Sequence, residues 1–282
     1  MKILVFGKSG QVATALQQRA DVTALGRADA DLTNSAACAA AIAAHAPDVV
    51  INAAAYTAVD KAEEEEAIAL TVNGDAPTAM AQACASAGIP FVHISTDYVF
   101  DGSGDAPWPT DAPTGPLGAY GRTKLAGEDG IRAAGGTFAI LRTAWVFSET
   151  GNNFVKTMLR LAETRDALNV VNDQFGGPTD ADAIAAACLE IAAQLHADAS
   201  KSGTYHFAGM PHVSWADFAN AIFDTASKTV AVSGIPASEY PTPAVRPSNS
   251  RLDCDALTAT FGIPAPKWQD GLTRVIKSLQ AS

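Results

Sequence analysis

The chain has 282 residues, of which 48% are hydrophobic and 17% charged, and its 30 acidic side chains outnumber its 19 basic ones. The resulting net charge of -11 repels phosphate backbones, which argues against a nucleic-acid-binding protein. No apolar run approaches the roughly 18 residues of a membrane span, and the 4 cysteines lack metal or redox spacing, so we expect a reduced, cytoplasmic protein with no membrane partner.

Short apolar segments alternate with alanine-rich helical stretches in the first half of the chain. Strands are expected at Ile3–Phe6, Val22–Leu25, Asp48–Asn52, Phe91–Ser95 and Phe138–Arg142. Near-continuous apolar strands between helices are typical of a parallel sheet that is buried on both faces. The pattern predicts an α/β fold, a Rossmann-type doubly wound parallel sheet, with a nucleotide-binding domain over residues 1–147.

The second half of the chain has a different pattern. Helices are expected at Asn152–Thr164, Thr179–Leu195, Ser214–Ser227 and Trp268–Leu279, and short strands at Asn169–Asn172 and Thr204–Phe207. Two Pro/Gly-rich segments, Asp101–Gly118 and Ser233–Asn249, exceed the usual connection length, so we expect functional or disordered loops there. We predict a smaller, mainly helical, discontinuous substrate domain over 148–282, with a segment near 165–195 returning to the first domain.

A glycine turn, Gly7-Lys8-Ser9-Gly10-Gln11-Val12-Ala13, joins the first expected strand to the first helix. Glycines let the backbone turn sharply and approach a pyrophosphate, which then lies on the amides of the helix N-terminus. Ala13 replaces the third glycine of the usual fingerprint, which weakens the match without refuting it. An ordinary tight turn is the alternative, but the position in the first βα unit favours a dinucleotide cofactor bound at Gly7 and Gly10.

The end of the second expected strand bears on the choice of cofactor. Gly26 stands near the point where a free ribose 2′-hydroxyl usually meets an acidic residue, and Arg27 can neutralise a 2′-phosphate. We therefore predict NADPH in preference to NADH, with a solvated Arg27 as the alternative. Asp31 and Leu32 are candidates to flank the adenine, unless Asp31 caps the next helix. The small residues of Asn52-Ala53-Ala54-Ala55 leave room for a cofactor, or else reflect helix-sheet packing.

Tyr120 and Lys124 begin an expected helix, and their i,i+4 spacing places both on one face. A neighbouring ammonium stabilises the phenolate, so we expect it to lower the phenol pKa from about 10. Such a pair beside a nicotinamide is a proton donor for a carbonyl that receives hydride, whereas an exposed helical pair is the alternative. Thr96 follows a strand at its carboxyl end, where it is expected to hydrogen-bond the substrate oxygen or else cap a turn.

These motifs together resemble a known family. The matching segments are Gly7–Gln11, Asn52–Ala55, Thr57–Glu63, Ser95–Phe100, Tyr120–Lys124, Arg142–Val146, Gly151–Phe154, Asn172–Gln174, Tyr240–Pro243, Arg246–Pro247 and Asn249–Leu252. The set is similar to the extended short-chain dehydrogenases/reductases and, more narrowly, to the dTDP-4-dehydrorhamnose reductase family. The resemblance spans essentially the whole chain, and the late segments separate this family from its epimerase and dehydratase cousins.

The resemblance implies an activity and a catalytic set. The family reduces the 4-keto group of dTDP-4-dehydro-6-deoxy-L-mannose to give dTDP-L-rhamnose, using NADPH or NADH. The resemblance implies that Tyr120 donates the proton, that Lys124 holds the nicotinamide ribose, and that Thr96 contacts the carbonyl group of the substrate.

The resemblance also implies binding residues. Those expected along the cofactor are Gly10, Gln11 and Val12 at the pyrophosphate, Asp31 and Leu32 at the adenine, and Ala55, Tyr56 and Thr57 at its middle. Those expected against the sugar nucleotide are Thr96, Asp97 and Trp145, together with Asn153 of the Gly151–Phe154 match. A tryptophan is more often a core residue, but the place of Trp145 after a strand favours the site.

Charged residues outside these motifs suggest further roles. Arg246 and Arg251, in the second long segment, are candidate partners of the substrate diphosphate because an acidic protein needs local positive charge there, or else solvated arginines. The run Glu63–Glu66 cannot converge on one metal ion, since successive helix residues diverge, and we expect a solvated helix start.

Some members of the family carry an acidic residue in the first helix that takes part in a Mg²⁺-linked dimer contact. Ala15 stands at that place here, which argues against a metal-dependent dimer, and we expect no metal site. A monomer or a homodimer remains open.

Two other functions remain as alternatives. One is an epimerase or dehydratase that retains its nicotinamide through the catalytic cycle. The other is a non-catalytic regulatory subunit on this fold, such as a partner of methionine adenosyltransferase. The joint presence of Thr96, Tyr120 and Lys124 argues against the regulatory subunit. The exact 4-keto sugar stays open.

Overall fold

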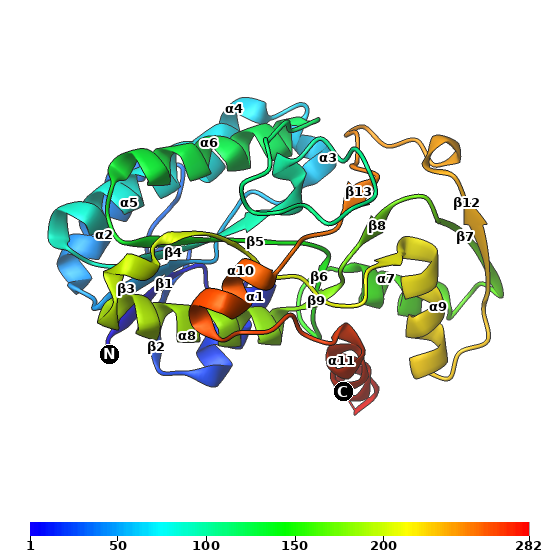
Figure 1. Ribbon diagram of the computed structural model, residues 1–282. Coiled ribbons are helices and arrows are strands. Elements are labelled where there is room, and N and C mark those ends of the chain that lie inside the picture. The colour runs from blue at the N-terminus through cyan, green and yellow to red at the C-terminus, as the bar shows by residue number, and fades with distance from the viewer. Residues whose placement is uncertain (282) are drawn as a thin grey trace.

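A six-stranded sheet forms the centre of the computed structural model, which describes residues 1–281 (Figure 1). Its strands are β1 Ile3–Phe6, β2 Val22–Leu25, β3 Val49–Asn52, β4 Phe91–Thr96, β5 Phe138–Thr143 and β10 Gly203–His206. They lie in the order β10-β5-β4-β3-β1-β2, and every neighbouring pair is parallel. The predicted doubly wound parallel sheet is confirmed.

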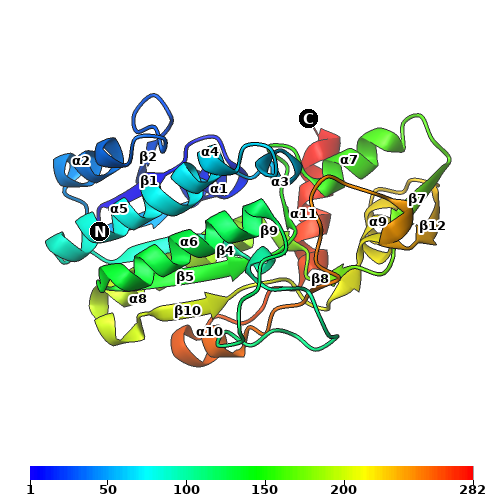
Figure 2. The ribbon, with the colours of Figure 1, turned by 90° about the horizontal axis from the view of Figure 1, so that it is seen from above.

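Helices cover both faces of this sheet (Figures 1 and 2). One layer consists of α2 Ser35–His45, α5 Ala76–Ala87 and α6 Ala119–Ala134, and the other of α1 Gln11–Arg19, α8 Ala181–Ala197 and α10 Asp255–Phe261. Alternation along β1 explains why two layers form, because successive side chains of a strand point to opposite faces. Ile3 and Val5 pack with α1 and α8, whereas Leu4 and Phe6 pack with α2 and α5.

A smaller part of the chain lies beside the sheet, at the right of Figures 1 and 2. It contains α7 Phe154–Leu161, α9 Trp215–Thr225 and α11 Trp268–Ala281, with the parallel strands β7 Ala167–Val171 and β12 Ala231–Ile235. Its core gathers apolar side chains from all five elements, among them Met158, Phe218 and Ile276. The division of the chain at residue 147 stays a prediction.

Among the differences from the expected elements, three concern the longer segments. β10, expected within the smaller domain, pairs with β5 at the edge of the main sheet. α10 was not expected, because a helix of seven residues shows too few apolar positions to reveal a period. The segment Ser233–Asn249 is not wholly loop, since it contains the end of β12, a 3₁₀ turn at Ala237–Glu239 and the start of β13, Asn249–Ser250.

Short elements complete the fold. They are α3 Val59–Ala62, α4 Glu66–Leu70, the π-helical turn η1 Thr71–Asp75, the 3₁₀ turns η2 Asp97–Val99 and η3 Ala199–Lys201, and the strands β6 Val146–Phe147, β8 Phe175–Gly176, β9 Thr179–Asp180 and β11 Val213–Ser214. Within residues 1–281, no helix combines the length and apolar character that crossing a bilayer requires.

The acidic run Glu63–Glu66 is not simply a solvated helix start, as the sequence had suggested. The carboxylate of Glu63 accepts a hydrogen bond from the backbone N–H of Ala119 at 2.8 Å. Glu66 forms an ion pair with Arg122, also at 2.8 Å. Both contacts hold the beginning of α6, which carries two of the predicted catalytic residues.

A buried ion pair joins α6 to β5. The carboxylate of Glu128 lies 2.7 Å from the guanidinium of Arg142, and both side chains are almost inaccessible to solvent. The Ser95 hydroxyl and the Arg132 guanidinium donate to the same carboxylate. Burial alone raises the pKa of Glu128, but the hydrogen bonds and charge of these partners hold it below its ordinary value. Glu128 is therefore buried as a carboxylate with its charge compensated.

Replacing Glu128 by glutamine should lower the free energy of unfolding by about 3–5 kcal/mol at pH 7, because Arg142 is then buried without its counter-charge. Urea unfolding measures the change. The loss should shrink as the pH falls from the ordinary carboxyl pKa toward the lowered one, where wild-type Glu128 also becomes neutral. The control is Asp129→Asn, since Asp129 pairs with Arg132 at the exposed surface. Equal losses in both variants would contradict the assignment.

Candidate active site

A cavity of about 760 Å³ lies along the carboxyl ends of the central strands, where residues that end or follow β1 to β5 line its wall. β1 neighbours β2 on one side and β3 on the other, so the strand order reverses here. Open α/β sheets bind their ligands at such a reversal, and the volume suits a small molecule. The position alone therefore marks this cavity as the candidate site.

Most residues that the sequence singled out line this cavity. They are Gly7, Gly10, Gln11, Val12, Arg27, Asp31, Leu32, Ala53, Ala54, Ala55, Thr57, Thr96, Asp97, Tyr120, Lys124 and Trp145. Residues that the sequence analysis missed also line it, notably Lys8, Tyr98, Asn152 and Trp215. Trp215 begins α9 in the smaller part, and no local pattern places it near the sheet.

Four of the predicted residues lie outside the cavity lining: Tyr56, Asn153, Arg246 and Arg251. The two arginines are engaged elsewhere. Arg246 pairs with Asp60 at 2.8 Å, and the Arg251 guanidinium lies over the ring of Phe175, 4.4 Å from its centroid. The expectation that these arginines face a bound diphosphate therefore stays a prediction, and in the ligand-free chain both guanidinium groups are engaged by protein partners.

Gly7 shows why the first turn has its sequence. Its φ is +110°, and a Cβ there would lie 3.3 Å from Ala13 and from the backbone of Ala53 and Ala54. Only glycine adopts this φ without strain, and only a residue without a Cβ lets the turn approach Ala13, Ala53 and Ala54 this closely. Ala13, in place of the third glycine, fits at this distance.

The N-terminus of α1 opens on the same cavity. Its N-cap is Gly10, which in the described chain provides no side-chain cap and would have open space around a Cβ. The first N–H groups of a helix need acceptors from outside the helix, and they attract anions. Together with the cradle at Gly7, this helix end fits the diphosphate of a dinucleotide.

Two cations, Lys8 and Arg27, line the cavity near Gly26. The nearby carboxylate of Asp29 accepts a hydrogen bond from the Gly26 N–H at 2.9 Å and lies 3.8 Å from the Lys8 ammonium. Asp31 does not cap α2, because that cap is Asn34. Its carboxylate instead accepts from the Thr33 N–H, which lowers its pKa.

Tyr120 lies in the first turn of α6, with its ring edge-on to that of Tyr98. Burial raises the pKa of the Tyr120 phenol to about 12, and a hydrogen bond with Thr96 offsets only part of this effect. The sequence had led us to expect a lowered value. That expectation was wrong for the ligand-free chain because it weighed the charge of Lys124 and overlooked the loss of solvent around the phenol.

Lys124 is buried beneath the cavity. Its Nζ donates to the Ile94 carbonyl at 2.7 Å and lies 3.1 Å from Nε2 of His93. Burial lowers the pKa of Lys124 to about 8, so the ammonium form still predominates at neutral pH. Burial and the Lys124 charge also hold the pKa of His93 well below its usual value, which keeps the imidazole neutral. His93 thus positions the ammonium, a role that we missed by treating each histidine as structural without naming its partner.

Asp97 presents a buried carboxylate at the cavity. Burial raises its pKa to about 6, against hydrogen bonds that favour the charge. One oxygen lies 3.0 Å from the Thr96 hydroxyl, which donates to it, whereas within residues 1–281 the other oxygen has no hydrogen-bond partner. An unsatisfied, perturbed carboxylate in a cavity is typical of a ligand-binding group.

Two tryptophans form an aromatic wall of the cavity. The indoles of Trp145 and Trp215 are stacked, with centroids 3.5 Å apart and planes 10° from parallel. Trp145 adopts a φ of +50°, which is uncommon for a residue with a side chain. Gly176 leaves room for the indole in this position, because a Cβ there would lie 2.7 Å from the Trp145 ring.

The last feature of the site is the arrangement of side chains that can bind a metal ion. Among the residues that the structure describes, no group of three or more His, Cys, Asp or Glu side chains is arranged to hold a metal ion. Ala15 is buried among α1 and α8 side chains. The expectation of a metal-free protein stays untested.

The parallel sheet, the open end of α1 and the meeting of Thr96, Tyr120 and Lys124 in one cavity define a Rossmann-type reductase of the extended short-chain dehydrogenase class. Comparison with known proteins narrows this class. The family model described as RmlD substrate binding domain matches residues 1–281, so the chain belongs to that family, whose curated relatives are dTDP-4-dehydrorhamnose reductases.

Individual relatives agree with this assignment. The dTDP-4-dehydrorhamnose reductase of Sinorhizobium fredii is 46% identical over 99% of this chain and 98% of its own length. The Clostridium acetobutylicum enzyme of that name, known from a crystal structure, is 38% identical in sequence to this chain. The two structures superpose with a TM-score of 0.92 over 99% of this chain and 100% of the other. The Bacillus anthracis enzyme, solved in complex with NADP, is 31% identical with a TM-score of 0.91 over the same shares.

Replacing Gly176 by alanine should displace the Trp145 indole, since the new methyl group has no room beside the ring. The expected results are an altered tryptophan signal in near-UV circular dichroism and a loss of about 1–3 kcal/mol in stability from overpacking. Gly115→Ala is the matched control, because a Cβ there makes ordinary contact with Asp101 at 3.4 Å. An unchanged tryptophan signal in Gly176→Ala would contradict the role given to this glycine.

Proposed function

We propose that the chain reduces the 4-keto group of dTDP-4-dehydrorhamnose, that is dTDP-4-dehydro-6-deoxy-L-mannose, to give dTDP-L-rhamnose with NADPH or NADH. The full-length relatives that carry the name of this reductase support the proposal. The observation that carries it is the placement of Tyr120, Thr96 and Lys124 in the same cavity as the open N-terminus of α1.

The residues of the cavity suit a nicotinamide dinucleotide. The backbone amides from Gly10 to Val12 would hold the diphosphate, and Lys124 the nicotinamide ribose. Arg27 would contact a 2′-phosphate at the adenosine end. When bound, the dihydronicotinamide supplies the hydride that the ketone carbon accepts.

The raised pKa of Tyr120 suits a proton donor. With a pKa of about 12, the phenol keeps its proton at neutral pH and transfers it as the carbonyl oxygen develops the charge of a more basic alkoxide. Thr96 hydrogen-bonds the phenol, and its hydroxyl proton, which Asp97 accepts in the ligand-free chain, would turn to the carbonyl oxygen of the substrate. The Lys124 ammonium would stabilise the negative charge of the phenolate that forms when Tyr120 gives up its proton.

The sugar nucleotide would bind against Asp97 and Trp145. The free carboxylate oxygen of Asp97 suits a sugar hydroxyl, and the Trp145 indole offers a flat apolar surface to the pyranose. We further propose that residues 1–147, joined by the returning elements α8, β10 and α10, form the nucleotide-binding domain, and that the rest of the chain from residue 148 forms a discontinuous substrate domain. We also propose a cytoplasmic monomer or homodimer without nucleic-acid or membrane partners, in keeping with the net charge of -11.

Purified protein given dTDP-4-dehydrorhamnose and NADPH should consume NADPH and form dTDP-L-rhamnose, followed by absorbance and identified by NMR. Tyr120→Phe should lower kcat by 10²- to 10⁴-fold, since the proton donor is lost, while the Kd for NADPH changes little. Tyr240→Phe, at an exposed tyrosine, is the control. Full turnover by Tyr120→Phe would refute the mechanism, and turnover without NADPH consumption would indicate an epimerase or dehydratase.

Arg27→Gln should lower kcat/KM for NADPH by roughly tenfold and leave kcat/KM for NADH nearly unchanged, because one charge-assisted hydrogen bond to the 2′-phosphate is lost. Steady-state kinetics with both cofactors measure the ratio. Arg165→Gln, at an exposed arginine outside the cavity, is the matched control. A ratio that matches wild type would show that Arg27 is a solvated surface residue.

A further inference from the structure

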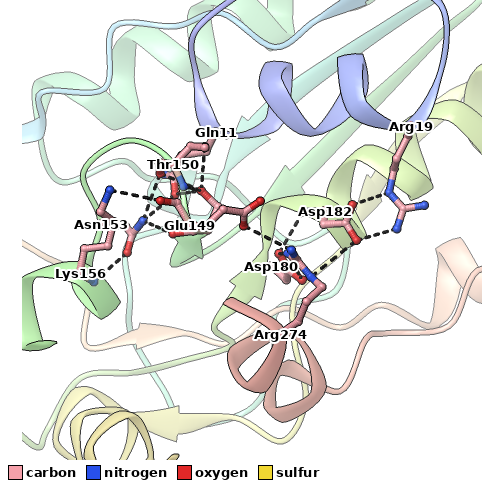
Figure 3. Close-up of polar contacts among 10 residues, drawn as sticks. Gln11, Arg19, Glu149, Thr150, Asn153, Lys156, Asp180, Asp182 and Arg274 are labelled. Atoms are coloured by element: carbon pink, nitrogen blue, oxygen red, sulfur yellow. Dashed lines mark hydrogen bonds and ion pairs between the residues drawn. The ribbon is translucent and has the colours of Figure 1, made fainter. Parts of the chain in front are cut away.

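The side chain of Gln11 links the beginning of α1 to a segment far along the chain (Figure 3). Its Oε1 accepts hydrogen bonds from Ser148 Oγ at 2.9 Å and from Asn153 Nδ2 at 3.0 Å. Gln11 is also the first residue of α1, so its backbone lies at the diphosphate end of the cavity. One residue therefore contacts the cavity with its backbone and a distant loop with its side chain.

The segment 148–153 that Gln11 holds is a compact loop that reaches the cavity. The Ser148 hydroxyl also contacts the Thr150 carbonyl at 2.8 Å, and Asn153 Nδ2 donates to the Ser148 carbonyl at 2.8 Å. Gly151 has a φ of +67°, and a Cβ there would lie 3.1 Å from Gln11 Cγ. Gly151 and its neighbour Asn152 line the same cavity as the glycine turn. The loop thus rests on the Gln11 side chain.

The Asn153 side chain continues the link into the smaller part. Its Oδ1 accepts from the Lys156 N–H at 3.1 Å and caps α7, while its Nδ2 reaches Gln11. α7 in turn packs against α9, the helix that begins with Trp215 of the cavity wall. A continuous set of contacts therefore joins the diphosphate end of α1 to the aromatic wall.

The other end of α1 has a second attachment, a set of ion pairs that also reaches the loop, as Figure 3 shows. Arg19 pairs with Asp182 at 2.6 Å, and Arg274 of α11 pairs with Asp180 at 2.8 Å and Glu149 at 3.3 Å. Arg19 does not line the cavity. Glu149 belongs to the loop 148–153, so these ion pairs hold the loop from the side away from the cavity, whereas Gln11 holds it at the cavity.

We propose that the Gln11 side chain is a positioning residue that couples occupancy of the diphosphate site to the order of loop 148–153 and the beginning of α7. The identity of the ligand rests on the proposed function. A diphosphate that fixes the first turn of α1 also fixes the Gln11 side chain, and two hydrogen bonds then hold the loop. Because coupling is reciprocal, an ordered loop in turn favours the bound cofactor.

The test compares variants by hydrogen exchange of the 148–156 region and by the Kd for NADPH, measured from its fluorescence. Gln11→Leu keeps the size of the side chain and removes the acceptor. Asn153→Ser keeps an oxygen to cap α7 and removes the donor to Gln11. Gln18→Leu, the same substitution at an exposed position of α1, is the matched control.

In the wild type and the Gln18→Leu variant, NADPH should slow exchange in both the glycine turn and residues 148–156. In Gln11→Leu and Asn153→Ser, the glycine turn should still be protected, whereas 148–156 should not respond. The Kd should rise roughly five- to tenfold in each, as expected for lost hydrogen bonds. The two substitutions combined should raise it no further than Gln11→Leu alone, because they break the same link.

Equal NADPH-dependent protection of 148–156 in wild type and Gln11→Leu would overturn the coupling, as would additive effects on Kd. Ser148→Ala removes the other donor to Gln11 and repeats the comparison should Gln11→Leu fold poorly. A wild-type protein that binds NADPH but does not reduce dTDP-4-dehydrorhamnose would overturn the proposed reaction alone. The exchange comparison would then still decide whether Gln11 couples the two sites.

Discussion

The close approach of the chain at Gly7 sets the geometry on which the site depends. β1 and β3 are neighbours, and the turn after β1 passes so near the turn after β3 that a side chain at Gly7 would press on Ala13, Ala53 and Ala54. Because the turn is this tight, α1 begins directly above the strand ends and leaves its first N–H groups facing the cavity. A diphosphate site results from backbone alone.

Loss of solvent is the second physical effect that shapes the site, and it acts on the phenol and the ammonium in opposite directions. It raises the pKa of Tyr120 and lowers that of Lys124, so the neutral phenol is strongly favoured and the ammonium only moderately. His93 is neutral, so its Nε2 can accept a hydrogen bond from the Lys124 ammonium without placing a second positive charge beside it. The free chain is thus ready to give a proton rather than to take one.

The cofactor half of the site could be predicted from sequence because its determinants are local. The glycine turn, the small residues after β3 and the Tyr120–Lys124 spacing each lie within a few residues of chain, and the alternating strands fix where they meet. The fold was predictable for the same reason. Local patterns failed where a partner is distant, as for β10, whose pairing with β5 no single segment reveals. They also missed how strongly burial acts on Tyr120.

The substrate half of the site depends on contacts between distant segments. Trp145 takes its position from Trp215 and Gly176, and the loop 148–153 rests on Gln11. Neither arrangement has a periodic signature, since each pairs residues at the ends of elements in different parts of the chain. Gln11, Trp145 and Trp215 border the cavity, so contacts that hold the smaller part against the sheet also shape the site. Substitutions that alter the recognised sugar can therefore lie at this junction while the glycine turn stays unchanged.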